Sequence, residues 1–229
     1  MNSVHVVITG ASGNLGKATV RKFLDTGYRV SAIISPRGNA SFLIEPDLKT
    51  YKADLFNEQE TEKVISEIIR ESGQVSVGIM IAGGFSVGSI RETSSGGIKN
   101  MLDLNFFSAY HTARALFRHM ERDGGILVFI GARPALDARQ GKHILAYTLS
   151  KSLLLRLAEI INEDGKQHGI KAVVVIPDII DTPRNRMDMP GADFSKWVTP
   201  RQVAEKIASL VTMQGKESGM NIIEVQGEE

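Results

Sequence analysis

The stretch from residue 4 to residue 24 constrains the fold more than any other part of the chain. The run from Val4 to Ile8 is rich in β-branched apolar residues, which is typical of a strand buried on both faces. Gly10, Gly13 and Gly16 follow at a spacing of three, and residues 17–24 have the pattern of an amphipathic helix. In this context the glycines permit a tight turn, and the helix N-terminus supplies N–H groups to a pyrophosphate. We therefore expect a dinucleotide site here; the alternative is a glycine-rich turn without a ligand.

The rest of the chain alternates predicted strands with predicted helices. Apolar runs predict strands over residues 29–34, 48–53, 75–81, 125–130, 170–176 and 221–225. Helical patterns cover residues 58–71, 98–121 and 145–164, and a last helix begins with Thr199 as N-cap and Pro200 at its first position. This alternation predicts an α/β fold, a doubly wound parallel sheet of Rossmann type with helices on both faces. The length of 229 residues fits a single domain over residues 1–229.

The charge balance argues against a nucleic-acid or membrane-surface partner, because 27 basic and 26 acidic residues leave a formal net charge of +1. The chain has no cysteine, and its 5 histidines show no ligand spacing, so we expect no metal site. Neither a signal peptide nor an apolar run of membrane-spanning length is visible. We expect a cytoplasmic enzyme that acts on a small molecule.

Tyr147 and Lys151 form the candidate catalytic pair. They stand at i and i+4, on one face of the helix predicted over residues 145–164. A tyrosine with a pKa of about 10 exchanges protons poorly at neutral pH, and a cation one turn away is expected to lower that pKa. The spacing alone is common on solvated helix faces, and the glycine turn is what favours a catalytic role.

Together these features resemble the short-chain dehydrogenase/reductase family. The resemblance rests on residues 9–16, Ala82-Gly83, Asn105, Tyr147 with Lys151, and residues 177–182. It implies catalytic roles for Tyr147, Lys151 and Asn105, and it places Lys151 on the nicotinamide ribose and Asp54 on the adenine amino group. The cofactor-binding residues that it implies are Gly10, Ser12, Gly13, Asn14, Leu15, Gly16, Ser35, Arg37, Asp54, Leu55, Ala82, Gly83, Gly84, Tyr147, Lys151, Pro177, Ile179 and Thr182.

One departure from the family is informative. Members usually carry a serine about a dozen residues before the catalytic tyrosine, where it shares the substrate oxyanion with that tyrosine. Between Gly131 and Ala146 this chain has no Ser or Thr. Loss of such a donor costs on the order of 3 kcal/mol in transition-state stabilisation. Either the chain is a degraded reductase, or its substrate does not need the second donor.

A narrower resemblance favours the second alternative. Residues 131–137 and 181–197 resemble the dihydropteridine reductase branch of the family, which carries Ala in the serine position. Members of that branch reduce a quinonoid dihydropterin, a conjugated ring for which Tyr147 alone is a sufficient acid. The resemblance implies a substrate lid over about residues 178–200. It also implies substrate contacts by Phe85, Ala132, Asn185 and Trp197, the last in an exposed segment, where it either covers the ring or anchors the lid to the core.

The end of the second predicted strand bears on the choice of cofactor. Residues 33–37 read I-I-S-P-R and lack the acid that binds the adenine ribose hydroxyls in that branch. An acid repels a 2′-phosphate, whereas the hydroxyl of Ser35 and the guanidinium of Arg37 attract one. We predict NADPH, with NADH as the alternative if Arg37 is only a solvated turn residue.

The sequence leaves the substrate class open. An NAD(P)H-dependent reductase of a pterin-like substrate is the prediction. A short-chain carbonyl or alcohol oxidoreductase and a non-catalytic dinucleotide-sensing protein are the alternatives. Asn105 and a longer loop over residues 137–147 depart from the dihydropteridine reductase branch. By resemblance, the helices around residues 98–121 and 145–164 pair across a two-fold axis, so a homodimer or homotetramer is expected.

Overall fold

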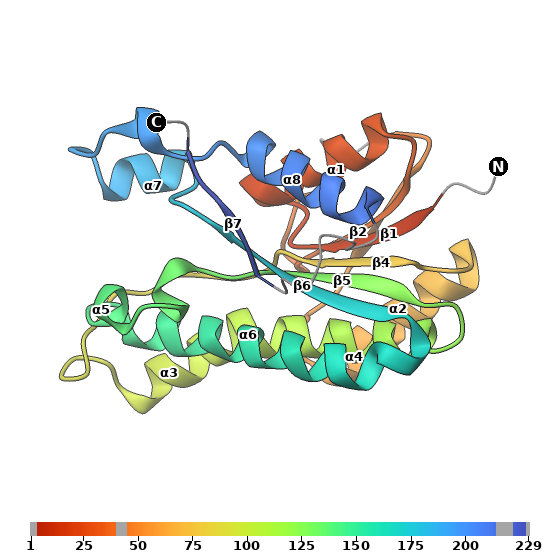
Figure 1. Cartoon of the computed structure of the whole chain (residues 1–229), viewed down its shortest axis with the longest axis horizontal. Helices are drawn as coiled ribbons and strands as arrows, with labels where there is room; N and C mark the ends of the chain where they lie inside the picture. The colour runs from red at the N-terminus through yellow and green to blue at the C-terminus, as the bar shows by residue number, and fades with distance from the viewer. Residues whose placement is uncertain (1–3, 40–44, 214–221, 228–229) are drawn as a thin grey trace.

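One parallel sheet organises the structure, a computed structural model that describes residues 4–39, 45–213 and 222–227. Within these residues the sheet has seven strands in the order β3-β2-β1-β4-β5-β6-β7 (Figure 1). Strands β2 and β3 lie on one side of β1, and β4 to β7 lie on the other, so the strand order switches between β1 and β4. Open α/β sheets bind ligands at the carboxyl ends of the strands at such a switch point. The strands are β1 (His5–Thr9), β2 (Arg29–Ile34), β3 (Leu48–Lys52), β4 (Val77–Met80), β5 (Gly125–Ile130), β6 (Ile170–Pro177) and β7 (Ile222–Val225).

Helices cover both faces of the sheet, so the predicted doubly wound α/β fold is confirmed (Figure 1). One face carries α1 (Asn14–Asp25) and α8 (Pro200–Thr212). The other carries α2 (Glu58–Ser72), α3 (Ser95–Leu102), α4 (Ser108–Met120) and α6 (Leu145–Gly165). The shorter helices are α5 (Ala138–Gly141), α7 (Pro183–Asp188) and 3-10 turns at Arg133–Ala135, Lys166–His168 and Phe194–Lys196. In the described part of the chain, no helix combines the length and apolar composition needed to cross a membrane.

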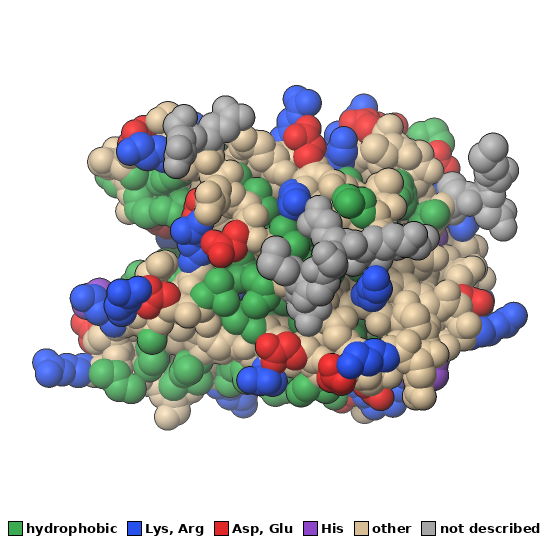
Figure 2. Space-filling model, in the orientation of Figure 1, with side chains coloured by type: hydrophobic (Ala, Val, Ile, Leu, Met, Phe, Trp, Pro, Cys, Tyr) green, Lys and Arg blue, Asp and Glu red, His purple; other side chains and the backbone are tan. Residues whose placement is uncertain are grey.

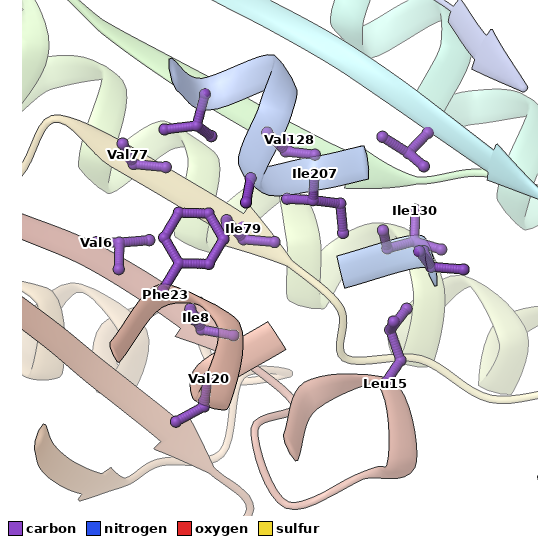
Figure 3. Close-up of a cluster of buried hydrophobic side chains, with 14 of the residues drawn as sticks. Val6, Ile8, Leu15, Val20, Phe23, Val77, Ile79, Val128, Ile130 and Ile207 are labelled. Carbon is purple, nitrogen blue, oxygen red and sulfur yellow. The ribbon is translucent and has the colours of Figure 1, made fainter. Parts of the chain in front are cut away.

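Each central strand contributes to two hydrophobic cores, because successive side chains of a strand point to opposite faces. In β1, Val6 and Ile8 join the core below α1 and α8, while Val7 joins the core on the other face. Figure 3 shows Phe23 of α1 among these side chains, beside Val6 and Ile79, and Phe23 is fully buried. Burial of such a side chain contributes about 1.5–3 kcal/mol. Burial on both faces explains why these strands read as continuous apolar runs.

The helix predicted over residues 98–121 is the main correction to the sequence analysis. The helical segment begins earlier, at Ser95, where the side chain of Ser94 caps it by accepting from Gly97 N at 3.1 Å. It is also not one regular helix, because a π-helical turn, Asp103–Phe107, separates α3 from α4. Asn105 lies in this turn, and π turns are frequent at functional sites.

The predicted start of α8 is confirmed. Thr199 is the N-cap and forms a capping box with Gln202, and Pro200 is the first helical residue. The predicted last strand is present as β7, whereas its predicted first residue, Asn221, lies outside the described residues.

Candidate active site

The glycine turn joins β1 to α1 at the point where β1 and β4 end. Gly10 has a φ of +64°, which favours glycine, and a Cβ there would lie 2.7 Å from the backbone nitrogen of Ala82. A Cβ on Gly16 would overlap the carbonyl oxygen of Gly10. Gly13 is the N-cap of α1 and has no side chain to block the first helical N–H groups. The local sequence therefore leaves the N-terminus of α1 open toward the carboxyl ends of the strands.

A cavity of ≈ 810 Å³ lies at this edge of the sheet. Its size is within the range of about 300–1,000 Å³ that ligand sites usually have. Thirteen of the predicted cofactor residues line it: Gly10, Ser12, Gly13, Asn14, Leu15, Gly16, Ser35, Arg37, Asp54, Leu55, Ala82, Gly83 and Thr182. The lining does not include Gly84, Tyr147, Lys151, Pro177 or Ile179.

Some of the lining residues were not predicted from the sequence. They are Ile33, Ile34, Pro36, Ala53, Phe56, Ile81, Leu104 and Ile180. Most of them are neighbours in sequence of predicted residues at the ends of β2, β3 and β4. Because the carboxyl ends of parallel strands meet at one edge of the sheet, the predicted strand ends could have indicated these residues. Phe56 is 48% exposed beside Asp54, whose carboxylate accepts a hydrogen bond from Phe56 N at 3.0 Å. The glycine cradle, the open helix N-terminus and the volume together fit a dinucleotide.

The rim of the cavity at the end of β2 carries positive charge. All of Ile34, Ser35 and Arg37 line the cavity, but Ser35 and Arg37 are exposed, whereas Ile34 is 1% exposed and its side chain belongs to the core. Within the described residues, Arg37 forms no ion pair. Its guanidinium is therefore available to a phosphate.

Tyr147 and Lys151 lie on the first turns of α6, next to the Gly83 end of the cavity. A Cβ on Gly83 would lie 3.6 Å from Lys151 Nζ, which donates to Ile130 O at the end of β5 at 2.8 Å. The same Nζ lies 5.9 Å from the ring centre of Tyr147. Among the described residues, the Tyr147 hydroxyl has no hydrogen-bond partner. The structure thus brings the predicted pair together and leaves the phenol open to a ligand.

The pKa of Tyr147 moves in the direction opposite to the one predicted. Burial raises the pKa of Tyr147 to about 12, because the charged phenolate is poorly solvated there. Burial also lowers the pKa of Lys151 to about 8, since the ammonium loses hydration. Tyr147 is therefore a neutral phenol at pH 7, which is the form that donates a proton.

Asn105 holds two parts of the protein together. Its Oδ1 accepts from Gly84 N at 2.9 Å, and its Nδ2 donates to Gly84 O at 3.1 Å and to Ser150 Oγ at 3.0 Å. The residue is buried, and both N–H groups of its amide are used by protein atoms. Asn105 thus fixes the loop after β4 against α6.

Ala132, which the resemblance places where the family carries serine, is 7% exposed and lies just beyond the end of β5. The next residue, Arg133, pairs through Nε with Asp178 Oδ1 at 2.7 Å and through Nη2 with Glu224 Oε2 at 3.2 Å. Asp178 directly follows β6. The segment after β5 is therefore tied to the beginning of the predicted lid.

Phe85 lies directly beside the candidate acid. The rings of Phe85 and Tyr147 meet edge to face, with centroids 5.0 Å apart and an interplanar angle of 70°. Phe85 is 59% exposed, and Val87 and Ile90 on the same loop are 79% and 75% exposed. The backbone of Gly88 anchors this loop by accepting from Leu145 N at 2.9 Å and donating to His143 O at 2.7 Å. Phe85, Val87 and Ile90 therefore form an exposed apolar surface on the loop that begins beside Tyr147.

The predicted lid, residues 178–200, is a structured segment that carries α7, and Figure 2 shows a hollow between it and the part of the molecule around α5. The side chain of Asn185 donates to Ile180 O at 2.7 Å. Trp197, predicted to lie in an exposed segment, is only 7% exposed and packs against Phe194 with centroids 4.7 Å apart. The ring of Trp197 is therefore largely withdrawn from solvent, as large apolar rings usually are, and its aromatic partner Phe194 lies in the same segment.

The described residues contain no group of three or more His, Cys, Asp and Glu side chains that could hold a metal ion. The buried histidine His5 is instead bonded to Ser31 Oγ at 2.9 Å, and burial lowers its pKa to about 4.

Comparison with known proteins identifies the family. The family model for short chain dehydrogenase matches residues 4–191. The chain is 28% identical over 211 residues to dihydropteridine reductase of Dictyostelium discoideum, covering 90% of this chain and 86% of that one. It is also 28% identical over 212 residues to the cyclic-di-GMP-binding biofilm dispersal mediator protein of Escherichia coli K12, with coverage of 90% and 88%.

A solved structure has the same fold. The blue fluorescent protein from a metagenomic library, in complex with NADPH, matches with a TM-score of 0.86 and 23% identity and covers 99% of this chain and 97% of its own. Together, the family model, the glycine cradle and the Tyr147–Lys151 pair show that this chain belongs to the short-chain dehydrogenase/reductase family of NAD(P)-dependent oxidoreductases.

Proposed function

We propose that this protein reduces a planar, conjugated, pterin-like acceptor with NADPH and that Tyr147 donates the proton. A quinonoid dihydropterin would gain one hydride and one proton and become the tetrahydropterin, while NADPH becomes NADP⁺. Bound NADPH supplies the hydride. The residues of the chain orient both molecules, exclude water and deliver the proton.

The contact between Phe85 and Tyr147 is the observation that favours this substrate class. The two rings are 5.0 Å apart, and Phe85 remains 59% exposed, so an aromatic surface beside the phenol is available to a ligand. Flat conjugated rings pack well against such a surface. Ala132, in the position where the resemblance expects a serine, has no hydroxyl, which disfavours acceptors that need two donors for an alkoxide.

The protonation state of Tyr147 suits a proton donor. With a pKa of about 12, the phenol stays protonated through the whole neutral range. Lys151, with a pKa of about 8, carries its charge at pH 7 and attracts the phenolate that forms when the proton leaves. A protonated Tyr147 and a charged Lys151 are the protonation states that a reduction needs, because the acceptor gains a proton.

The rim at Ser35 and Arg37 favours NADPH over NADH. Among the lining residues Asp54 is the one carboxylate, and it already accepts the backbone N–H of Phe56. No acid at the end of β2 opposes a 2′-phosphate. Proteins with an acid there prefer the free ribose hydroxyls.

We also propose that residues 178–200 cover the bound acceptor and that the protein forms the homodimer or homotetramer expected from the resemblance. Support for an interface comes from large apolar side chains that stay exposed near or on α6: Phe107, Leu149, Leu153 and Ile160. Sedimentation equilibrium of the purified protein measures the assembly directly, and a monomer at micromolar concentration would contradict it.

A substrate panel tests the function. Purified protein is assayed with NADPH and quinonoid dihydropterin beside simple ketones and aldehydes. We expect turnover of the pterin and weak activity on the ketones. Efficient ketone reduction without pterin reduction would make the protein a carbonyl oxidoreductase instead. Tight NADPH binding without turnover of any acceptor would favour a nucleotide-binding role, a class to which the name of the Escherichia coli relative points.

A further inference from the structure

The hydroxyl of Ser150 is buried within the turn that carries the candidate catalytic pair. Ser150 is 0% exposed and lies on α6 between Tyr147 and Lys151. Buried hydroxyls persist where they are hydrogen-bonded. Ser150 Oγ donates to Tyr147 O at 2.7 Å and accepts from Asn105 Nδ2 at 3.0 Å. It therefore joins the backbone of the candidate acid to a second element.

The backbone of Gly84 fixes the direction of these hydrogen bonds. Its N–H can only donate, so the side-chain atom of Asn105 that lies 2.9 Å away must be the oxygen. The amide nitrogen of Asn105 then faces Gly84 O and Ser150 Oγ and donates to both. The single proton of the Ser150 hydroxyl is left for the carbonyl of Tyr147. One continuous chain of hydrogen bonds thus runs from the loop after β4 to the candidate acid.

The turn of α6 that carries the pair is held from two sides. Lys151 ties it to the end of β5 through Ile130 O at 2.8 Å, and Ser150 ties it through Asn105 to the loop after β4. Ser152, on the same helix, differs in one respect. Its hydroxyl donates to Thr148 O at 2.9 Å, and within the described residues it makes no hydrogen bond to another element.

We propose that Ser150 is a positioning residue, which fixes the phenol of Tyr147 relative to the Gly83 end of the cavity. The proposal rests on the proposed role of Tyr147 as the proton donor. A shift of a donor by a fraction of an ångström lowers the rate of proton transfer strongly and leaves distant binding contacts intact. Removal of the Ser150 hydroxyl should therefore lower kcat and leave the affinity for NADPH unchanged.

Ser150→Ala is tested with Ser152→Ala as its matched control. NADPH affinity is measured by fluorescence, folding by thermal unfolding, and kcat and KM with the best acceptor from the panel. We expect Ser150→Ala to lower kcat about tenfold, with Kd and KM within about twofold of wild type. Ser152→Ala should leave all three constants unchanged. In the Asn105→Ala background, Ser150→Ala should lower kcat by a smaller factor than it does in wild type, because the chain of hydrogen bonds is already broken.

Equal kcat values for Ser150→Ala and Ser152→Ala would overturn the proposal, as would a loss that resides in the Kd for NADPH. If Ser150→Ala fails to fold, Ser150→Cys retains the size with a weaker donor and should lower kcat in the same direction, whereas an unchanged kcat would refute the role. Tyr147→Phe is measured in parallel. If its turnover is normal, the proposed function is wrong; if Tyr147→Phe is inactive and Ser150→Ala is normal, the inference about Ser150 alone is wrong.

Discussion

Removal of the Arg37 guanidinium should weaken NADPH binding and leave NADH binding unchanged. The guanidinium is exposed at the rim of the cavity, where it can form two charge-assisted hydrogen bonds to a 2′-phosphate. Each such bond is worth about 1.5–3 kcal/mol before solvent screening. Because Arg37 is exposed, we expect a net difference of about 1.4 kcal/mol, which is about tenfold in affinity. Arg37→Ala should therefore lower kcat/KM for NADPH by about tenfold.

A reversal of the preference requires an acid at Ser35 and not at Ile34. Ile34 is 1% exposed and belongs to the core, so an aspartate there would bury a carboxylate and destabilise the fold. Ser35 is exposed and lines the cavity. In Ser35→Asp/Arg37→Ala the acid would accept from the free ribose hydroxyls and repel the phosphate, so NADH should become the better cofactor.

The assay compares kcat/KM for NADPH and NADH in wild type, Arg37→Ala and the double variant. Arg122→Ala is the control, because its side chain is 90% exposed and lies between α4 and β5, at the opposite edge of the sheet. The NADPH preference of wild type should also shrink as the salt concentration rises. Arg37 would be only a solvated turn residue if Arg37→Ala left the ratio of kcat/KM for NADPH to kcat/KM for NADH unchanged. NADH binding as tight as NADPH binding in wild type would lead to the same conclusion.

Two further predictions concern Lys151 and the glycine turn. The pKa of Lys151 falls from 10.5 to about 8 on folding, so the unfolded chain holds the proton more tightly between these values and stability rises with pH there. Relative to Lys151→Met, the free energy of unfolding of wild type should gain about 3 kcal/mol between pH 8 and 10.5 in urea titrations. Over the same window kcat/KM should fall as Lys151 loses its charge; a flat profile would contradict this role. Gly16→Ala should abolish NADPH binding and lower the melting temperature, because its Cβ overlaps Gly10 O, whereas Gly191→Ala has open space and should change neither.

The parts of the fold that the sequence predicts well are those with local signals. The central strands are buried on both faces, so they appear as apolar runs, and the glycine turn has one conformation that its neighbours allow. Residues at the carboxyl ends of neighbouring strands meet by topology alone. For this reason Asp54 and Ala82 line the cavity beside Gly10, although they are far apart in sequence.

Other features depend on tertiary packing and have no local signal. The pKa of Tyr147 rises because the phenol is buried, and the spacing of Tyr147 and Lys151 in the sequence does not reveal that burial. The π-helical turn at Asn105 interrupts a helix whose apolar pattern continues through it. The hydrogen bond between Asn105 and Ser150 joins two elements that are far apart in sequence, so residue spacing could not predict it. Trp197 is buried beside Phe194, and an aromatic residue in a polar run does not reveal whether its ring is buried or exposed.

Tyr147→Phe tests the central claim, an NADPH-dependent reduction with Tyr147 as the acid, most directly. The substitution removes only the hydroxyl, and the ring contact with Phe85 can remain. NADPH affinity by fluorescence and turnover of quinonoid dihydropterin are measured on the same preparation. We predict an unchanged Kd and a loss in kcat of at least ~100-fold, the usual contribution of a general acid. Turnover equal to that of wild type would contradict the assignment of Tyr147 and, with it, the proposed reaction.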